Sequence, residues 1–284
     1  MKILVVGATG KQGSHVARHL LNRGHHVHAF TRNPKSTVIK ELESLGATTV
    51  VGNLVDRQSI EKALESVDAF FAITTRVPEG VRTEIEQGIN IGNAAKAKNK
   101  YLVFSSVASA DKKTGIPHFD SKTTIEEHFK EIELEACVLA PVYFMENIFA
   151  MPQLKEGQYV TTLPFNRRLQ QVALDDIAAF ATLALEHPKR FKNKRIELAS
   201  ESLTPEDVIE IISKVSGKPI EYVQVPVEQV KDLDMAAMFS FFNKPGFQVD
   251  IVELHRAYPE IPWHNYLSWA KEQNWQNTPT LFHP

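Results

Sequence analysis

Three glycines with the spacing GxxGxxG follow a short apolar run at the start of the chain. The segment reads GATGKQG and leads into a helical pattern. We expect Gly7 to allow a tight turn, Gly10 to let a pyrophosphate approach the main chain, and Gly13 to let the helix pack closely on the strand. Free amides at the helix N-terminus would face the phosphates. The strand–turn–helix context predicts a dinucleotide-binding loop, whose contact residues would be Gly7, Thr9, Gly10, Lys11, Gln12 and Gly13.

The charges after the second predicted strand bear on which dinucleotide this loop would hold. NAD-selective sites place a carboxylate there, where it binds the ribose 2′-hydroxyl. Residues 31–36 read TRNPKS and contain no carboxylate. Arg32 offers a fixed fork suited to a 2′-phosphate, and Lys35 adds a second positive charge. The sequence therefore predicts NADP(H) as the cofactor, rather than NAD(H).

Two further strand ends carry polar residues that bear on the same site. A GNLVD turn follows the third predicted strand, and we expect Asn53 and Leu54 to flank the adenine. Asp56 precedes the helical pattern RQSIEKAL, so we interpret it as a structural N-cap. Thr74 and Thr75 end the fourth predicted strand, at the carboxyl edge where such sheets bind ligands. Lining of the cofactor cleft and capping of the next turn are both open interpretations of these threonines.

Several of these motifs together resemble a known family. The segments GATGKQG, TRNP, GNLVD, HFDSK and PVYFMEN resemble the NmrA-like family of atypical short-chain dehydrogenase/reductases, and within it the HSCARG-type NADPH-sensor proteins. The resemblance covers nearly the whole chain, including Met235–Phe242. It implies a Rossmann domain with a small C-terminal lobe and NADP(H) binding. Because family members serve as redox sensors, transcriptional co-regulators or reductases, the resemblance implies the fold better than the function.

The catalytic residues of this family are only partly matched. Active short-chain dehydrogenases carry Tyr-x-x-x-Lys on a helix and a serine after the fifth strand; this chain has Ser105 and Ser106 after YLVF, and Lys122 in SKTTIEEHFK. The tyrosine position holds His118, four residues before Lys122. We expect Lys122 to contact the nicotinamide ribose. His118 is either without a catalytic role or a proton donor in place of the tyrosine. Tyr143 is a second candidate donor, or else part of the pocket wall.

Three other patterns are expected to be structural. His25, His26 and His28 alternate between the faces of a strand and lack a cysteine or carboxylate beside them, so no metal site is predicted. The basic run at 189–195 is expected to be a solvated connecting loop. With a net charge of −2, direct nucleic-acid binding is not predicted. A stripe of Met and Phe at 235–242 has helical spacing and is expected to be core, or to roof a pocket.

These side chains need a scaffold of alternating strands and helices, and the first half of the chain has that pattern. Apolar runs such as ILVV and YLVF lack strict alternation, which is typical of strands buried on both faces. Strands are predicted at Lys2–Val6, His26–Phe30, Thr48–Val51, Ala69–Ile73, Tyr101–Phe104 and Ala136–Leu139. Helices are predicted near 11–23, 36–45, 57–65, 82–98 and 121–131. This succession predicts an α/β fold, a Rossmann doubly wound parallel sheet with right-handed crossovers.

The second half of the chain has more prolines and a weaker strand–helix alternation. We predict a strand end and a helix in Val172–Glu186, a strand at Arg195–Ala199, and helices at Pro205–Ser216 and Glu228–Phe242 that cap the cofactor cleft. Two domains are therefore predicted. Residues 1–150 would form the NAD(P)-binding Rossmann domain, with a return at 172–199. Residues 151–284 would form a smaller α/β C-terminal lobe over the cleft.

The composition limits the class of protein. Apolar residues make up 43% and charged residues 23%, as in ordinary globular proteins. Since no run approaches the roughly 18 uncharged apolar residues needed to cross a bilayer, no membrane association is predicted. The single cysteine, Cys137, excludes an intrachain disulfide, and its apolar surroundings predict that it is buried. The N-terminal MKILVVGATG lacks a small-residue cleavage site, so we expect a cytoplasmic protein.

Three functions fit these features. A sensor of cofactor state would change its C-terminal lobe, or the loops near Arg32 and Val77–Val81, with the redox form of the cofactor and pass the signal to a protein partner. An NADPH-dependent reductase would place His118, Lys122 and Tyr143 around a small apolar carbonyl or quinone. A third possibility is an inert cofactor-binding scaffold. The missing tyrosine favours the sensor over the reductase.

Overall fold

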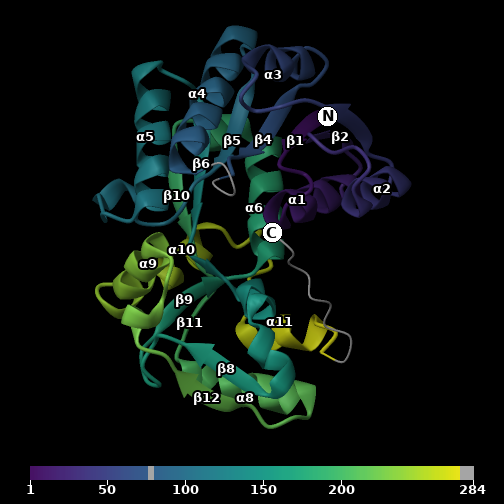
Figure 1. Cartoon of the computed structure of the whole chain (residues 1–284). Helices are drawn as coiled ribbons and strands as arrows, with labels where there is room; N and C mark the ends of the chain where they lie inside the picture. Colours follow the sequence, from purple (N-terminus) through teal and green to yellow (C-terminus); the bar gives the residue numbers. More distant parts are fainter. Residues whose placement is uncertain (76–79, 276–284) are drawn as a thin grey trace. The chain divides into compact units, whose positions relative to one another are not determined.

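The computed structural model describes residues 1–75 and 80–275, which form two compact units (Figure 1). The first unit comprises Met1–Lys113, Pro117–Ala140 and Ile177–Glu197. The second comprises Thr114–Ile116, Pro141–Asp176 and the chain from Leu198 onward. Most of the loop at Val77–Val81, for which a response to the cofactor is predicted, lies outside the described residues.

A seven-stranded sheet with the order β10-β6-β5-β4-β1-β2-β3 is the framework of the first unit. Its strands are β1 (Lys2–Val6), β2 (His26–Thr31), β3 (Thr48–Val51), β4 (Ala69–Ile73), β5 (Tyr101–Ser105), β6 (Ala136–Pro141) and β10 (Arg195–Leu198). The five pairings from β3 across to β6 are all parallel. The strand order changes direction between β1 and β4, which is where open α/β sheets bind ligands beyond the carboxyl ends of their strands. The predicted Rossmann doubly wound sheet is confirmed.

Helices pack along this sheet in two groups. The helices are α1 (Lys11–Asn22), α2 (Thr37–Ser44), α3 (Arg57–Leu64), α4 (Val81–Lys98), α5 (Pro117–Glu131), α6 (Leu174–Glu186) and α7 (Pro188–Phe191). Successive members of the group α3, α4 and α5 pack against one another. In the other group, α1 packs against α2 and is joined to α6 by a hydrogen bond between His19 Nδ1 and Thr182 Oγ1 at 3.0 Å.

The burial of the strands explains why their sequences lack alternation. In β1 the four residues after Lys2 are fully buried, and in β4 the first four residues are buried. Phe70 and Phe104 extend into a core cluster that Ile125 and Phe129 of α5 complete. A strand with helices on both faces buries side chains in both directions, so continuous apolar runs result.

Side-chain caps define where two helices of the first unit begin. The Ser36 hydroxyl accepts a hydrogen bond from Ile39 N at 3.2 Å at the start of α2. The Asp56 carboxylate accepts one from Gln58 N at 3.0 Å at the start of α3. Each cap satisfies an amide that has no partner inside its helix. The structural interpretation of Asp56 is confirmed.

The second unit contains short strands and helices. They are β7 (Tyr143–Phe144), β8 (Gln158–Thr161), β9 (Leu169–Val172), β11 (Glu201–Leu203), β12 (Glu221–Gln224), α8 (Pro205–Ser216), α9 (Leu233–Asn243), α10 (Ile251–Ala257) and α11 (Tyr266–Glu272), with 3-10 turns η2 (Met145–Ala150), η3 (Pro152–Glu156) and η4 (Val227–Gln229). β11, β9 and β7 form one small sheet, and β12 pairs with β8 in another. Tyr266 and Trp269 of α11 pack into a core cluster with Ile212 of α8.

Two expectations about the second half of the chain need correction. The helix predicted at Glu228–Phe242 begins later, because the Asp232 carboxylate caps α9 by accepting hydrogen bonds from Asp234 N and Met235 N. The basic run at 189–195 is not simply a solvated loop. It begins inside α7, where Phe191 is fully buried, and ends on β10, where Arg195 forms ion pairs.

Candidate functional site

The glycine loop closes tightly between β1 and α1. Gly7 has a φ of +80°, and a Cβ on it would lie 2.5 Å from Ile73 Cγ2. Gly10 N donates to Gly7 O at 2.9 Å. A Cβ on Gly13 would lie only 2.1 Å from Gly7 O, so the first turn of α1 rests directly on the loop backbone. Gly7 and Gly13 therefore have the steric roles that the spacing predicts.

The N-terminus of α1 lacks a side-chain cap. Gly10 is its N-cap residue, and no acidic side chain lies in its first turn. The amides of such a first turn and the positive end of the helix dipole make a site for an anion. Gln12 turns inward, and its Oε1 accepts a hydrogen bond from the Ser105 hydroxyl at 2.6 Å. This contact attaches the loop to the end of β5. Because the Gln12 side chain is directed inward, the main-chain amides are the part of the loop that would bind a phosphate.

A pocket of about 180 Å³ lies beside this loop, over the carboxyl ends of β1 to β4. Its lining residues are Val6, Gly7, Thr9, Phe30, Thr31, Arg32, Asn33, Gly52, Asn53, Leu54, Ile73, Thr75 and Gln87. Five predicted cofactor residues are among them, namely Gly7, Thr9, Arg32, Asn53 and Leu54. Lys35 is exposed and is not a lining residue, while its amide donates to Asn33 Oδ1 at 3.1 Å.

The end of β2 holds Arg32 at the edge of this pocket. Thr31 Oγ1 accepts a hydrogen bond from Asn33 N at 3.0 Å, which fixes the turn on either side of the arginine. Arg32 is exposed and is the one charged side chain among the described residues that line the pocket. A guanidinium in this position attracts a phosphate, and none of the described lining residues carries a carboxylate that would repel one.

The GNLVD turn is held on two sides. Asn53 N donates to the Ser59 hydroxyl of α3 at 3.0 Å, and Asn90 of α4 donates from its side-chain amide to Leu54 O at 3.0 Å. Thr75 at the end of β4 is held by α4 as well, because Thr75 N donates to Gln87 Oε1 at 3.0 Å. The pocket wall is therefore fixed by hydrogen bonds from the helices behind it.

Lys122 lies in a buried polar cluster at the end of β4. Its side chain is 9% exposed, and its ammonium donates to Thr74 Oγ1 and pairs with Glu84 Oε1 at 2.9 Å. Ser121 Oγ donates to Glu84 Oε2 at 2.7 Å, and Thr74 Oγ1 donates to Glu84 Oε1 at 3.0 Å. Burial alone would raise the pKa of Glu84, but the Lys122 ammonium and the two hydroxyls hold it below its usual value. The cluster is thus an ionised pair with its acceptors satisfied.

Sequence reasoning missed Glu84 and Gln87, although a signal was present. In the α4 sequence, Glu84 lies four residues before Gly88 and seven before Ile91, and all three are buried. Gln87 falls on the same face. A glutamate on the apolar face of a predicted helix needs a buried partner. That requirement points to a cation such as Lys122.

The two serines after YLVF have protein partners. The Ser105 hydroxyl donates to Gln12, as described above, and the Ser106 hydroxyl donates to Glu126 Oε1. Glu126 Oε2 accepts from Arg195 Nε at 2.9 Å, and Arg195 Nη1 also pairs with Glu197 at 3.0 Å. Ser106 therefore belongs to a buried ion-pair network of the first unit.

His118 lies in the first turn of α5, one turn before Lys122. The helix extends far enough back for the i, i+4 relation between the two residues. The His118 ring is half-buried and packs edge-on against Phe119, with ring centroids 4.8 Å apart. The Lys122 ammonium is directed instead at Thr74 and Glu84.

Tyr143 belongs to the second unit, where it lines an apolar pocket of about 210 Å³. Its ring meets Phe242 edge-on, with centroids 5.6 Å apart. Burial raises the pKa of Tyr143 to about 12, so the phenol stays protonated at neutral pH. Phe239 and Phe242 of α9 line the same pocket, while Met238 is buried. The predicted stripe of α9 thus contributes both to a pocket wall and to the core.

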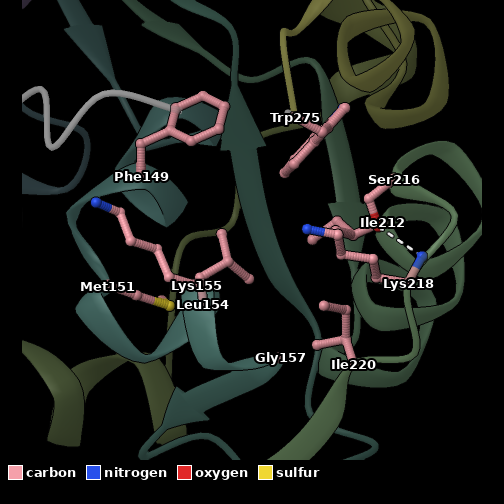
Figure 2. Close-up of a pocket in the computed structure, with 10 residues that line it drawn as sticks. All are labelled: Phe149, Met151, Leu154, Lys155, Gly157, Ile212, Ser216, Lys218, Ile220 and Trp275. Atoms are coloured by element: carbon pink, nitrogen blue, oxygen red, sulfur yellow. Dashed lines mark hydrogen bonds between the residues drawn. The ribbon is translucent and has the colours of Figure 1, made fainter. Parts of the chain in front are cut away.

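A second pocket of the second unit, of about 340 Å³, is larger than the one beside the glycine loop. Figure 2 shows Phe149 and Leu154 on one side of it, and Trp275, Ile212 and Ile220 on the other. None of the predicted site residues lines it. Of these two pockets, the smaller one is the one that the predicted cofactor residues line.

A serine, an aspartate and a histidine meet in the second unit. The Asp176 carboxylate is fully buried, accepts from the Ser200 hydroxyl, and pairs with His264 Nδ1 at 2.6 Å. The hydrogen bond to Asp176 raises the pKa of His264 to about 9, against an opposing effect of burial. Since the aspartate lies between the other two, the histidine does not activate the serine. This cluster is a structural ion pair and lacks the order of a catalytic triad.

Within residues 1–75 and 80–275, no group of three or more His, Cys, Asp or Glu side chains is arranged to hold a metal ion. No helix in the described part of the chain has the length and apolar character that a membrane span requires.

Comparisons with known proteins agree with this geometry. A family model described as the NmrA-like family matches residues 1–270. An NmrA-like family domain-containing protein of Dictyostelium discoideum is 32% identical over 268 residues, which cover 86% of this chain and 88% of that protein. Among solved structures, an NADPH-dependent quinone oxidoreductase from Escherichia coli, complexed with NADPH, aligns with a TM-score of 0.78 and 20% identity over 95% of this chain and 98% of that one. The negative transcriptional regulator NmrA in complex with NADP aligns with a TM-score of 0.76 and 20% identity, over 95% and 94% of the two chains.

Proposed function

The chain belongs to the NmrA-like family, and on that premise we propose that it binds NADP(H) and senses the redox state of that cofactor. The observation that carries the proposal is the pocket beside the glycine loop, to which Arg32 gives a positive charge and whose described lining residues include no carboxylate. The uncapped N-terminus of α1 would receive the pyrophosphate, and Arg32 would bind the 2′-phosphate. NADP and NADPH in complexes of two proteins with this fold support the choice of cofactor.

Regulation of a protein partner is the output we propose. The position of the usual catalytic tyrosine is occupied by His118, and the Lys122 ammonium is held in a buried ion pair. Neither feature favours proton transfer. A regulator would need different affinities for NADPH and NADP, since a ligand shifts an equilibrium only by its differential affinity for the two states. We place this activity in the cytoplasm, in line with a single, buried cysteine.

Reduction of a small apolar carbonyl or quinone is the second function that we propose. It is favoured by the apolar pocket in which the protonated Tyr143 is a wall residue, because such a pocket suits an apolar ring. NADPH would supply the hydride, and Tyr143 or His118 the proton. Lys122 would contact the nicotinamide ribose in either function.

The decisive experiment combines titration with turnover. Calorimetric titrations of the purified protein with NADPH, NADP and NADH would be accompanied by NADPH oxidation assays with a panel of quinones and aldehydes. We expect tight binding of NADP(H), unequal affinities for the two redox forms, and no rapid turnover. Rapid turnover that is lost in Tyr143→Phe or His118→Ala would replace the sensor by the reductase. A preference for NADH over NADPH would contradict both.

A further inference from the structure

The Lys122 ammonium has three N–H donors, and the cluster at the end of β4 uses two of them. One is directed at Glu84 Oε1, 2.9 Å away, and one at the Thr74 hydroxyl. The Phe104 ring lies on another side, with its centroid 5.5 Å from Nζ. Within the described part of the chain, these two groups are the hydrogen-bonding partners of the ammonium, which leaves one donor for a hydroxyl group from outside the cluster.

Glu84 is built to hold this ammonium in one orientation. The residue is 3% exposed, and both of its carboxylate oxygens are occupied. Oε1 accepts from Lys122 and Thr74, and Oε2 accepts from Ser121. A carboxylate removed from water at such a position costs free energy unless a cation and hydrogen bonds compensate it. The whole arrangement leaves the lysine side chain little freedom to reorient.

The same helix face also reaches the cofactor pocket. Gln87, one turn after Glu84 on α4, accepts from Thr75 N at 3.0 Å. Thr75 and Gln87 are lining residues of the pocket beside the glycine loop. Two consecutive residues of the β4 end, Thr74 and Thr75, are thus held by two side chains of α4. The Lys122 ammonium is therefore held by the same strand end and the same helix that form part of the pocket wall.

We propose that Glu84 is a positioning residue, which fixes the Lys122 ammonium at the carboxyl end of β4 so that one N–H is directed to the nicotinamide ribose. This inference rests on the proposed function, because it needs NADP(H) in the pocket and Lys122 at the ribose. Glu84 itself does not touch the cofactor and acts only through the lysine. Its contribution to binding should therefore vanish when the lysine is absent.

A double-mutant cycle tests this dependence. NADPH affinity is measured by the fluorescence of the bound nicotinamide for wild type, Glu84→Gln, Lys122→Met and the double variant, below the melting temperature of each. We expect about a tenfold loss of affinity in each single variant, the size of one charge-assisted hydrogen bond. The double variant should lose about tenfold as well, whereas independent roles would give about a hundredfold.

Glu126→Gln is the matched control. Glu126 is also a buried glutamate of the first unit, pairs with Arg195 at 2.9 Å, and does not line the cofactor pocket. This variant should lower the melting temperature and leave NADPH affinity unchanged. Glu84→Asp, which keeps the charge, should retain more affinity than Glu84→Gln.

The outcomes distinguish failure of this inference from failure of the proposed function. If wild type does not bind NADPH, the proposed function fails. If wild type binds and Lys122→Met binds equally well, the ribose contact fails and the role of Glu84 with it. If Lys122→Met is weakened and Glu84→Gln is not, or if the two losses multiply in the double variant, Glu84 is not a positioning residue.

Discussion

Arg32 and Lys122 are two cations of the first unit with opposite surroundings. Arg32 is exposed at the pocket edge, whereas Lys122 is buried with Glu84. Salt screens an exposed charge far more than a buried pair. If both meet the cofactor, the Arg32 contribution should weaken as ionic strength rises, and the Lys122 contribution should change little.

We predict that Arg32→Ala removes the preference for NADPH over NADH. Loss of a charge-assisted contact to the 2′-phosphate should weaken NADPH binding by about tenfold to a hundredfold and leave NADH binding nearly unchanged. Calorimetric titration with both cofactors measures this. Arg57→Ala is the control, since Arg57 lies on α3, pairs with Glu61 at 2.6 Å, and does not line the pocket. Equal losses for NADPH and NADH would contradict the assignment.

The sequence predicted the residues of the cofactor pocket better than those of the Lys122 cluster. Gly7, Arg32 and Asn53 each lie just beyond a strand that the sequence predicts, so their place at the carboxyl edge follows from the fold. Glu84 and Gln87 lie within a helix, and their partners are ten or more residues away in the sequence. Such contacts depend on how the helices pack, and no single segment encodes them.

At the scale of elements, α1 and the glycine loop pack against each other at backbone contact distance. The contact of Gly13 with the backbone of Gly7 leaves no space for a side chain, while a Cβ on Gly10 would meet Gly7 O at 3.4 Å. Gly10 also has φ −88°, which an alanine adopts readily. The two glycines should therefore differ in what their replacement damages.

We predict that Gly13→Ala and Gly10→Ala separate stability from binding. Gly13→Ala should lower the free energy of unfolding by about 1–3 kcal/mol, because the loop or the helix must shift. Gly10→Ala should lower the free energy of unfolding by less than about 1 kcal/mol. It should nevertheless weaken NADPH binding more than about tenfold, because its methyl group would meet the pyrophosphate. Chemical denaturation and NADPH titration of both variants measure these effects. Unchanged affinity in Gly10→Ala would argue against the phosphate site.

Elements of the first half were predicted closely, and those of the second half less so. β1, β3 and β4 have the predicted bounds. β1 and β4 are apolar runs that are almost wholly buried, whereas β3, with the sequence TTVV, is half-exposed and has β-branched residues throughout. The second unit uses strands of two to four residues, such as β7 and β11, which are too short to show a period. α8 is an exception and matches its prediction, because Thr204 and Asp207 form a capping box and Gly217 ends the helix.

At the scale of the whole molecule, the second unit carries a pH-dependent ion pair. The pKa of His264 is raised to about 9 by Asp176, above the value near 6.5 of an unfolded chain. Folding therefore takes up a proton between these values. The stabilisation is fully present below pH 6.5 and is lost as the pH rises through 9.

We predict that the wild-type protein loses stability between pH 6.5 and 9. Because the His264 side chain is 16% exposed, we expect a fall of about 1–2 kcal/mol, below the full effect of the pKa shift. Urea unfolding at several pH values in this window measures the slope. His264→Gln, which cannot titrate, should be less stable at pH 6.5 and show a flatter profile. An equal slope in both proteins would show that another group is responsible.

Cys137 in β6 makes opening of the central sheet measurable. The thiol is fully buried, and burial raises its pKa to about 12, so alkylating reagents find neither access nor a thiolate while the strand is paired. As this is the single cysteine, each chain takes up at most one label, and the labelled fraction measures how many chains have opened the sheet. Alkylation should be far slower than in urea-unfolded protein, and slower still with NADPH present if the cofactor stabilises the first unit. The rate at which Cys137 is alkylated thus measures how fast the sheet opens, without any engineered probe.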